Sequence, residues 1–193
     1  MTYRITYFFF TSICLFFLTS CGSSNQSAEE SATETEVVAT QENAGDLTED
    51  ATSPQDRVLL AAMSFRMQDQ LSRIAQRKAE NPAIKQLGQS IVESNEQALS
   101  MLNNLAEATE TQVPESLSPI QQKIIDSLDQ LSGSEFDKAY LEALAKDQQQ
   151  NIDNLQSLNT EIDNPIIRDV STGLVDIQEP QLEAVQEAQS EMM

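Results

Sequence analysis

The sequence predicts an all-α protein: a bundle of four long helices in two helical hairpins, with a short extra helix between the hairpins. Three observations lead to this fold class. Four Ser-Pro or Asn-Pro pairs place an N-capping side chain before a proline, whose missing N–H costs nothing in the first turn. Apolar residues recur at intervals of three and four over long stretches. No alternating pattern of useful length predicts a strand, so the amphipathic helices must pack on one another.

The expected helices follow these signals in chain order. The four capping pairs are Ser53-Pro54, Asn81-Pro82, Ser118-Pro119 and Asn164-Pro165. A fifth start is expected at Ser134, after Gly133, where Glu135 and Asp137 suit the positive end of a helix dipole. These starts predict helices at about 54–80, 82–109, 119–131, 135–161 and 165–190.

The connections between the helices predict part of the topology. Short turns at 80–82 and 161–165 make the first two and the last two long helices antiparallel pairs. The segment 110–133 between the pairs has two possible courses, because it can cross along the bundle or cap one end. Pro180 is expected to kink the last helix, or to split it into 165–178 and 180–190.

The first 20 residues have the order of a secretory signal peptide. Arg4 precedes an apolar run from Phe8 to Leu18, which is too short to span a bilayer. The next residues complete Leu18-Thr19-Ser20-Cys21, which resembles the bacterial lipobox; the alternative is an ordinary signal peptide with an incidental cysteine. The resemblance implies that Cys21 becomes the first mature residue and carries a diacylglyceryl group and an N-acyl chain such as palmitate, enough for stable anchoring. Gly22 then resembles the residue found in lipoproteins sent to the outer membrane, so we expect a bacterial envelope protein facing the periplasm.

A spacer follows the cysteine. Residues 22–53 contain eight acidic residues and no basic one, and their few apolar residues show no period. Such a segment cannot bury enough surface to offset its ordering entropy, so it is expected to be disordered, with a reach of roughly 30 Å. The predicted organisation is therefore a signal peptide at 1–20, a lipidated cysteine and acidic tether at 21–53, and a bundle domain at 54–190.

Composition excludes several classes of function. The formal net charge is −20 and becomes one unit more negative when Arg4 leaves with the signal. Such a surface repels nucleic acid and anionic headgroups. The chain has no His, which excludes His-based catalysis and His-containing zinc sites. Cys14 leaves with the signal, so no disulfide can form within one mature chain. We expect no enzyme activity and no cofactor.

One level of the apolar stripes is polar. The side chains expected to face inward there are Gln70 in the first helix, Ser94 or Asn95 in the second, Asp147 or Gln148 in the fourth and Gln181 in the last. If the helices align at mid-length, Gln70, Asn95, Gln148 and Gln181 meet in one layer, where amides can satisfy one another or hold a water and fix helix register. The alternatives are exposure of some of these residues, or a metal or ligand site built from Asp147 with Glu93 or Glu179.

Several segments resemble a known family. They are Asn81–Lys85, Ile91–Asn95, Phe136–Ala143 and Lys146–Gln148, with Leu-Ser-Gly before Phe136. Their order and spacing are similar to domain-of-unknown-function family 4142, whose members are predicted outer-membrane or periplasmic proteins with a ferritin-like helical bundle. The resemblance covers about residues 54–188, and it implies a ferritin-like fold for this chain.

The chain departs from the pattern that this family implies for a metal site. The pattern has Asp-His in the second helix and in the third long helix, a His in the last and Glu in the first. The matching residues here are Ser94-Asn95, Asp147-Gln148, Pro180 or Gln181, and Gln68 and Gln70. Carboxylate-bridged metal bundles need several Glu and two His, and amide oxygens are poor substitutes. A transition-metal centre is therefore not expected.

Three functions follow from these observations. The first is a non-enzymatic envelope lipoprotein whose bundle is a binding or structural module, with the membrane and an unidentified envelope protein as partners. The second is a ferritin-like metal protein, which only the fold resemblance favours. The third is a bundle that uses its acidic face on a basic protein or on divalent cations.

Overall fold

A computed structural model describes residues 53–192 and confirms the all-α bundle. The five helices are α1 (Pro54–Lys78), α2 (Pro82–Ala108), α3 (Pro119–Asp129), α4 (Gly133–Glu161) and α5 (Pro165–Glu191). None of them is long and apolar enough to cross a membrane. The predicted signal peptide, Cys21 and nearly all of the predicted tether lie outside the described residues, so those domain bounds stay predictions.

The capping signals act as the sequence predicts. Ser53 accepts the N–H of Asp56, Asn81 that of Ala83, and Asn164 those of Ile166 and Ile167. At the start of α3, the Ser118 side chain accepts the Gln121 N–H and the Gln121 side chain accepts the Ser118 N–H, which makes a capping box. These bonds satisfy N–H groups that the first turn leaves free.

The start of α4 differs from the prediction by two residues. The helix begins at Gly133, which has a φ of 60°, and the preceding Ser132 makes no side-chain cap. Besides its favourable charge at the start of α4, Asp137 makes contacts that the sequence did not predict. It is buried, and its two carboxylate oxygens accept the backbone N–H groups of Glu80 and Asn81 at 3.0 and 2.8 Å. This carboxylate ties the α1–α2 turn to the first turn of α4.

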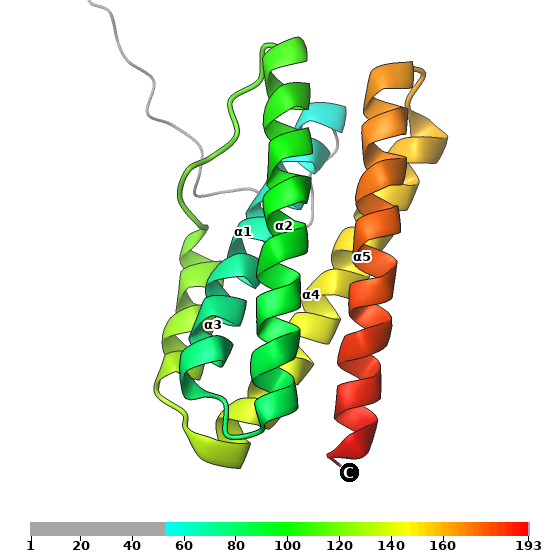
Figure 1. Cartoon of the computed structure of the whole chain (residues 1–193). Helices are drawn as coiled ribbons and strands as arrows, with labels where there is room; N and C mark the ends of the chain where they lie inside the picture. Colours follow the sequence, from blue (N-terminus) through cyan, green and yellow to red (C-terminus); the bar gives the residue numbers. More distant parts are fainter. Residues whose placement is uncertain (1–52, 193) are drawn as a thin grey trace, which may run out of the picture. The chain divides into compact units, whose positions relative to one another are not determined.

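The segment between the two hairpins crosses the length of the bundle. Figure 1 shows the chain leaving α2 at one end, returning through residues 109–118 and α3, and entering α4 at the other end. α1 packs mainly on α2 and α4, α5 packs on α4 and α2, and α3 lies against α1 and α4. Every pair of neighbouring long helices is thus antiparallel, as a ferritin-like bundle requires.

Pro180 does not split the last helix. α5 runs without interruption from Pro165 to Glu191, and Pro180 is on its exposed side. The proline removes one N–H from the helical ladder, but the exposed position leaves water free to bond the carbonyl that loses its partner. Of the two outcomes expected at Pro180, a kink or a split, the split into 165–178 and 180–190 is wrong.

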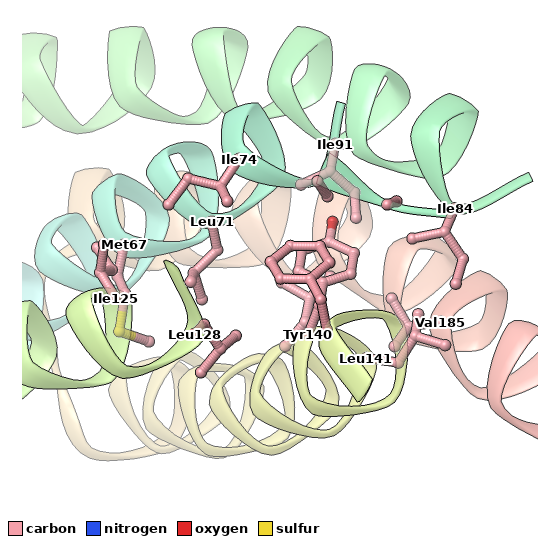
Figure 2. Close-up of a cluster of buried hydrophobic side chains, with 14 residues drawn as sticks. Met67, Leu71, Ile74, Ile84, Ile91, Ile125, Leu128, Tyr140, Leu141 and Val185 are labelled. Atoms are coloured by element: carbon pink, nitrogen blue, oxygen red, sulfur yellow. The ribbon is translucent and has the colours of Figure 1, made fainter. Parts of the chain in front are cut away.

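The buried apolar residues form two clusters, one in each half of the bundle. The first contains Leu71, Ile91, Tyr140 and Val185, and Figure 2 shows that all five helices contribute side chains to it. The second contains Phe65, Leu102, Leu155 and Leu174 from the four long helices. Burial of these clusters provides the main driving force for assembly of the bundle.

Candidate functional site

A layer of buried polar side chains lies between the two apolar clusters. Each long helix changes from one cluster to the other at a polar level, for example at Ser64 and Gln68 on α1 or between Ile91 and Ala98 on α2. We call the side chains at these levels the polar layer: Ser64, Gln68, Ser94, Asn95, Asp147, Gln148, Asn151, Gln178 and Gln181. The layer joins all four long helices at mid-length.

The first half of the layer connects α1, α4 and α5. Asp147 Oδ2 accepts hydrogen bonds from Ser64 Oγ at 2.6 Å and from Gln68 Nε2 at 2.8 Å. Gln68 Oε1 in turn accepts from Gln178 Nε2 at 3.0 Å, and Gln178 Oε1 accepts from Asn151 Nδ2 at 2.7 Å. Gln68 and Gln178 therefore each use the oxygen and the nitrogen of the amide on neighbouring helices, as buried amides favour.

The second half connects α4, α5, α2 and α1. Gln148 Nε2 donates to Gln181 Oε1 at 3.1 Å. Gln181 Nε2 donates to Ser94 Oγ at 2.7 Å and to Asn95 Oδ1 at 3.2 Å, and Asn95 Nδ2 donates to the Phe65 carbonyl at 3.3 Å. Gln148 Oε1 is a buried acceptor with no hydrogen-bond partner among the described residues.

Asp147 is the ionisable member of the layer. Burial raises the pKa of its carboxyl to about 6, although the hydrogen bonds from Ser64 and Gln68 act in the opposite direction. Near neutral pH this carboxyl therefore carries a negative charge that only two neutral donors stabilise, in a poorly hydrated position.

Three of the four residues chosen from the apolar stripes lie in the layer. Asn95, Gln148 and Gln181 are buried. Gln148 donates a hydrogen bond to Gln181, and Gln181 donates one to Asn95. Gln70 is exposed, and its assignment to the layer is wrong, because Gln68 takes that place on α1. The cause is the unusually wide buried face of α1, which packs against α2, α3 and α4.

The centre of that face runs through small residues. Ala61, Ser64, Ser72 and Ala75 lie in line with Gln68 and are all buried. Large apolar residues recur at intervals of three and four at Met63, Met67, Leu71 and Ile74, but this stripe marks only one edge of the face. Gln70 lies just beyond that edge.

Two more pairs of alternatives are resolved by the structure. Ser94 and Asn95 both accept from Gln181, and Asp147 and Gln148 both belong to the layer, with Asp147 half-buried. Ser64, Asn151 and Gln178 were missed by the sequence reasoning. A signal existed for Gln178 and Asn151, since each lies one helical turn from a core leucine, but the larger Ile177 and Ile152 beside them dominated the pattern.

Glu93 and Glu179 do not join Asp147. Both are exposed; Glu93 accepts a hydrogen bond from Gln89 on its own helix, and Glu179 accepts one from Gln156. The alternative of a site built from Asp147 with Glu93 or Glu179 is wrong, because both glutamate side chains are exposed and contact other residues.

The polar layer does not fit a transition metal. Within residues 53–192, no three His, Cys, Asp or Glu side chains come together. The amide N–H groups of the layer point at oxygens that a metal would need as ligands. Transition metals of ferritin-like bundles take carboxylate and imidazole, so this donor set is the wrong one.

Fold and site together define a four-helix bundle with a crossover connection, whose core is divided by a layer of amides. The family model for a domain of unknown function, DUF4142, matches residues 28–188, and the chain belongs to this family. The match ends at Ala188, where the resemblance predicted, and begins within the segment expected to be a tether. No curated protein and no solved structure matches the chain.

Proposed function

We propose that this protein is a bacterial envelope lipoprotein, anchored through Cys21, whose bundle is a non-enzymatic binding or structural module. The observation that carries the proposal is the lipobox-like Leu18-Thr19-Ser20-Cys21 behind a basic and apolar leader. Two acyl groups on one cysteine are needed for stable attachment, because a single chain holds only weakly. Gly22 favours the outer membrane, with the bundle in the periplasm and an envelope protein as its partner.

The layout of the bundle is compatible with such an anchor. The chain enters it at Ser53, at the end where α2 finishes and α5 begins (Figure 1). A spacer of the length between Cys21 and Ser53 reaches roughly 30 Å, so the bundle would stand clear of the lipid headgroups. The polar layer supports a structural rather than a catalytic core, since its amides are bonded to one another across all four long helices.

Intact-mass analysis of the protein from its native membrane tests the anchor. The expected result is a chain that begins at Cys21 and carries the mass of a diacylglyceryl group and an acyl chain. Cys21→Ala should lose the added mass. Cys14→Ala is the matched control, because it removes the other cysteine and should leave the added mass unchanged. An unmodified wild-type chain released in soluble form would overturn the proposal.

A further inference from the structure

A groove lies beside the polar layer, between α1, α3 and α4. It has a volume of about 970 Å³, within the range of small-molecule sites. α1 contributes Leu60, Met63 and Met67, and α3 contributes Ile120, Ile124 and Leu128. Ile120 is 67% exposed, so its side chain is available to a ligand in the groove. The crossover creates this groove, because α3 forms its outer wall.

The α4 wall carries the charge of the groove. Asp147 lines it together with Glu142 and Lys146. The last two are exposed, have opposite charges and are one helical turn apart, so their charges largely offset each other. The lining residues from α1 and α3 are all neutral. Asp147 therefore sets the net charge of the groove.

Half of the Asp147 carboxylate is available to a ligand. The bonds from Ser64 and Gln68 both go to Oδ2. Oδ1 accepts no hydrogen bond from residues 53–192, and it is not sealed from solvent. The polar layer thus holds one oxygen of the carboxylate, and the other oxygen of this groove-lining residue has no hydrogen-bond partner among the described residues.

From this geometry we propose that the groove binds a small amphiphilic cation, with its apolar body on Leu60, Ile120 and Ile124, whose side chains are at least partly exposed, and its ammonium group beside Asp147 Oδ1. A cation offsets the poorly hydrated carboxylate, and a charge-assisted bond is stronger than a neutral one. An anion would face both Asp147 and a chain of net charge −20.

The proposal deepens the binding role proposed above, but it rests on the bundle alone. It can fail while the lipid anchor stands, and the anchor can fail while the groove binds. The groove test measures ligand affinity, whereas the anchor test measures the mass of the chain, so the two failures are distinguishable.

Calorimetric titration of the full-length protein with octylamine, octanol and octanoate at pH 7.5 provides the test. We expect saturable binding of octylamine, weaker binding of octanol and none of octanoate. Asp147→Asn should weaken octylamine binding at least about tenfold, in keeping with loss of a charged hydrogen bond, and should leave octanol binding within about twofold. Asp153→Asn is the matched control: it makes the same change on an exposed part of α4 and should alter neither.

A second variant tests the apolar wall independently of the carboxylate. Ile120→Asn changes an exposed residue, so the bundle should keep its melting temperature, but octylamine and octanol should both bind more weakly. The proposal is overturned if wild-type protein shows no saturable octylamine binding, if Asp147→Asn and Asp153→Asn behave alike, or if Ile120→Asn leaves both affinities unchanged.

Discussion

Asp147 gives the bundle a pH dependence that follows from its raised pKa. In the unfolded chain this carboxyl ionises near 3.8, and in the folded chain near 6. Below about pH 3.8 the carboxyl is protonated in both the folded and the unfolded chain, so it adds no pH dependence to the free energy of unfolding. Between the two values the unfolded chain loses its proton first, and the free energy of unfolding therefore falls as the pH rises. Above about pH 6 the carboxyl is ionised in both states, and its contribution to the free energy of unfolding no longer changes with pH.

The variant Asp147→Asn isolates this effect. Relative to wild type, its free energy of unfolding should rise by roughly 2 to 3 kcal/mol between pH 4 and pH 7, since each pKa unit corresponds to about 1.4 kcal/mol. Urea denaturation at several pH values measures the difference, and the other carboxyls cancel because both proteins contain them. A flat difference for Asp147→Asn would contradict the assigned pKa.

Two glutamines on α1 provide a matched test of the polar layer. Gln68→Ala removes a side chain that bonds Asp147 and Gln178, so two buried polar groups lose a partner. We expect a loss of about 2–4 kcal/mol in the free energy of unfolding. Gln70→Ala changes an exposed residue of the same type and should stay within about 0.5 kcal/mol of wild type. Equal losses in thermal or urea unfolding would contradict the layer as described.

Gln68 and Gln70 also show how far the sequence predicts which individual side chains are buried. Gln68 was one of two candidates from the family resemblance, whereas the apolar period pointed to Gln70. Periodicity identifies a stripe of large apolar side chains, but it does not mark a buried face lined by Ala61 and Ser64. Residues on such a face become recognisable only when the neighbouring helices are in place.

At the scale of elements, the helices follow from local chemistry. Four capping pairs set the starts of α1, α2, α3 and α5, and the structure places all four there. α4 was less predictable, because its start has no side-chain cap and depends on Gly133 at positive φ. Its first turn is also held by a distant partner, the α1–α2 turn, through Asp137.

Asp137 links the start of α4 to the α1–α2 turn, so its removal should destabilise both elements. Asp137→Ala leaves the part-buried N–H groups of Glu80 and Asn81 without their acceptor, and we expect a loss of about 2–3 kcal/mol in the free energy of unfolding. Glu135→Ala removes an exposed acid from the same turn and should cost less than about 1 kcal/mol. Urea unfolding compares the two variants. Similar costs would mean that the dipole, and not the tie to the turn, explains the acid at position 137.

At the scale of the whole molecule, the sequence did not determine the path of the segment that joins the two hairpins. The segment 110–133 had two possible courses, because its length suits both a crossover and a cap. The crossover has two consequences in the structure. It makes all neighbouring long helices antiparallel, and it places α3 beside α1 and α4, where the groove forms.

The arrangement of the core is also a property of the whole molecule. Polar intervals on four helices coincide only because the two hairpins align, and the result is one hydrogen-bonded layer between two apolar clusters. In a ferritin-like bundle this is the level at which inward-facing ligands can meet. We infer that in this chain the layer is structural and does not bind a transition metal.

Elemental analysis tests that claim most directly. The full-length protein would be purified natively, incubated with Fe²⁺, Mn²⁺ or Zn²⁺ in turn, desalted and analysed for bound metal. Our account predicts far less than one ion per chain, because amides bonded to one another offer no site that competes for these metals. Retention of one or more ions per chain, lost on replacing Gln148 or Asn95 by Ala, would contradict it.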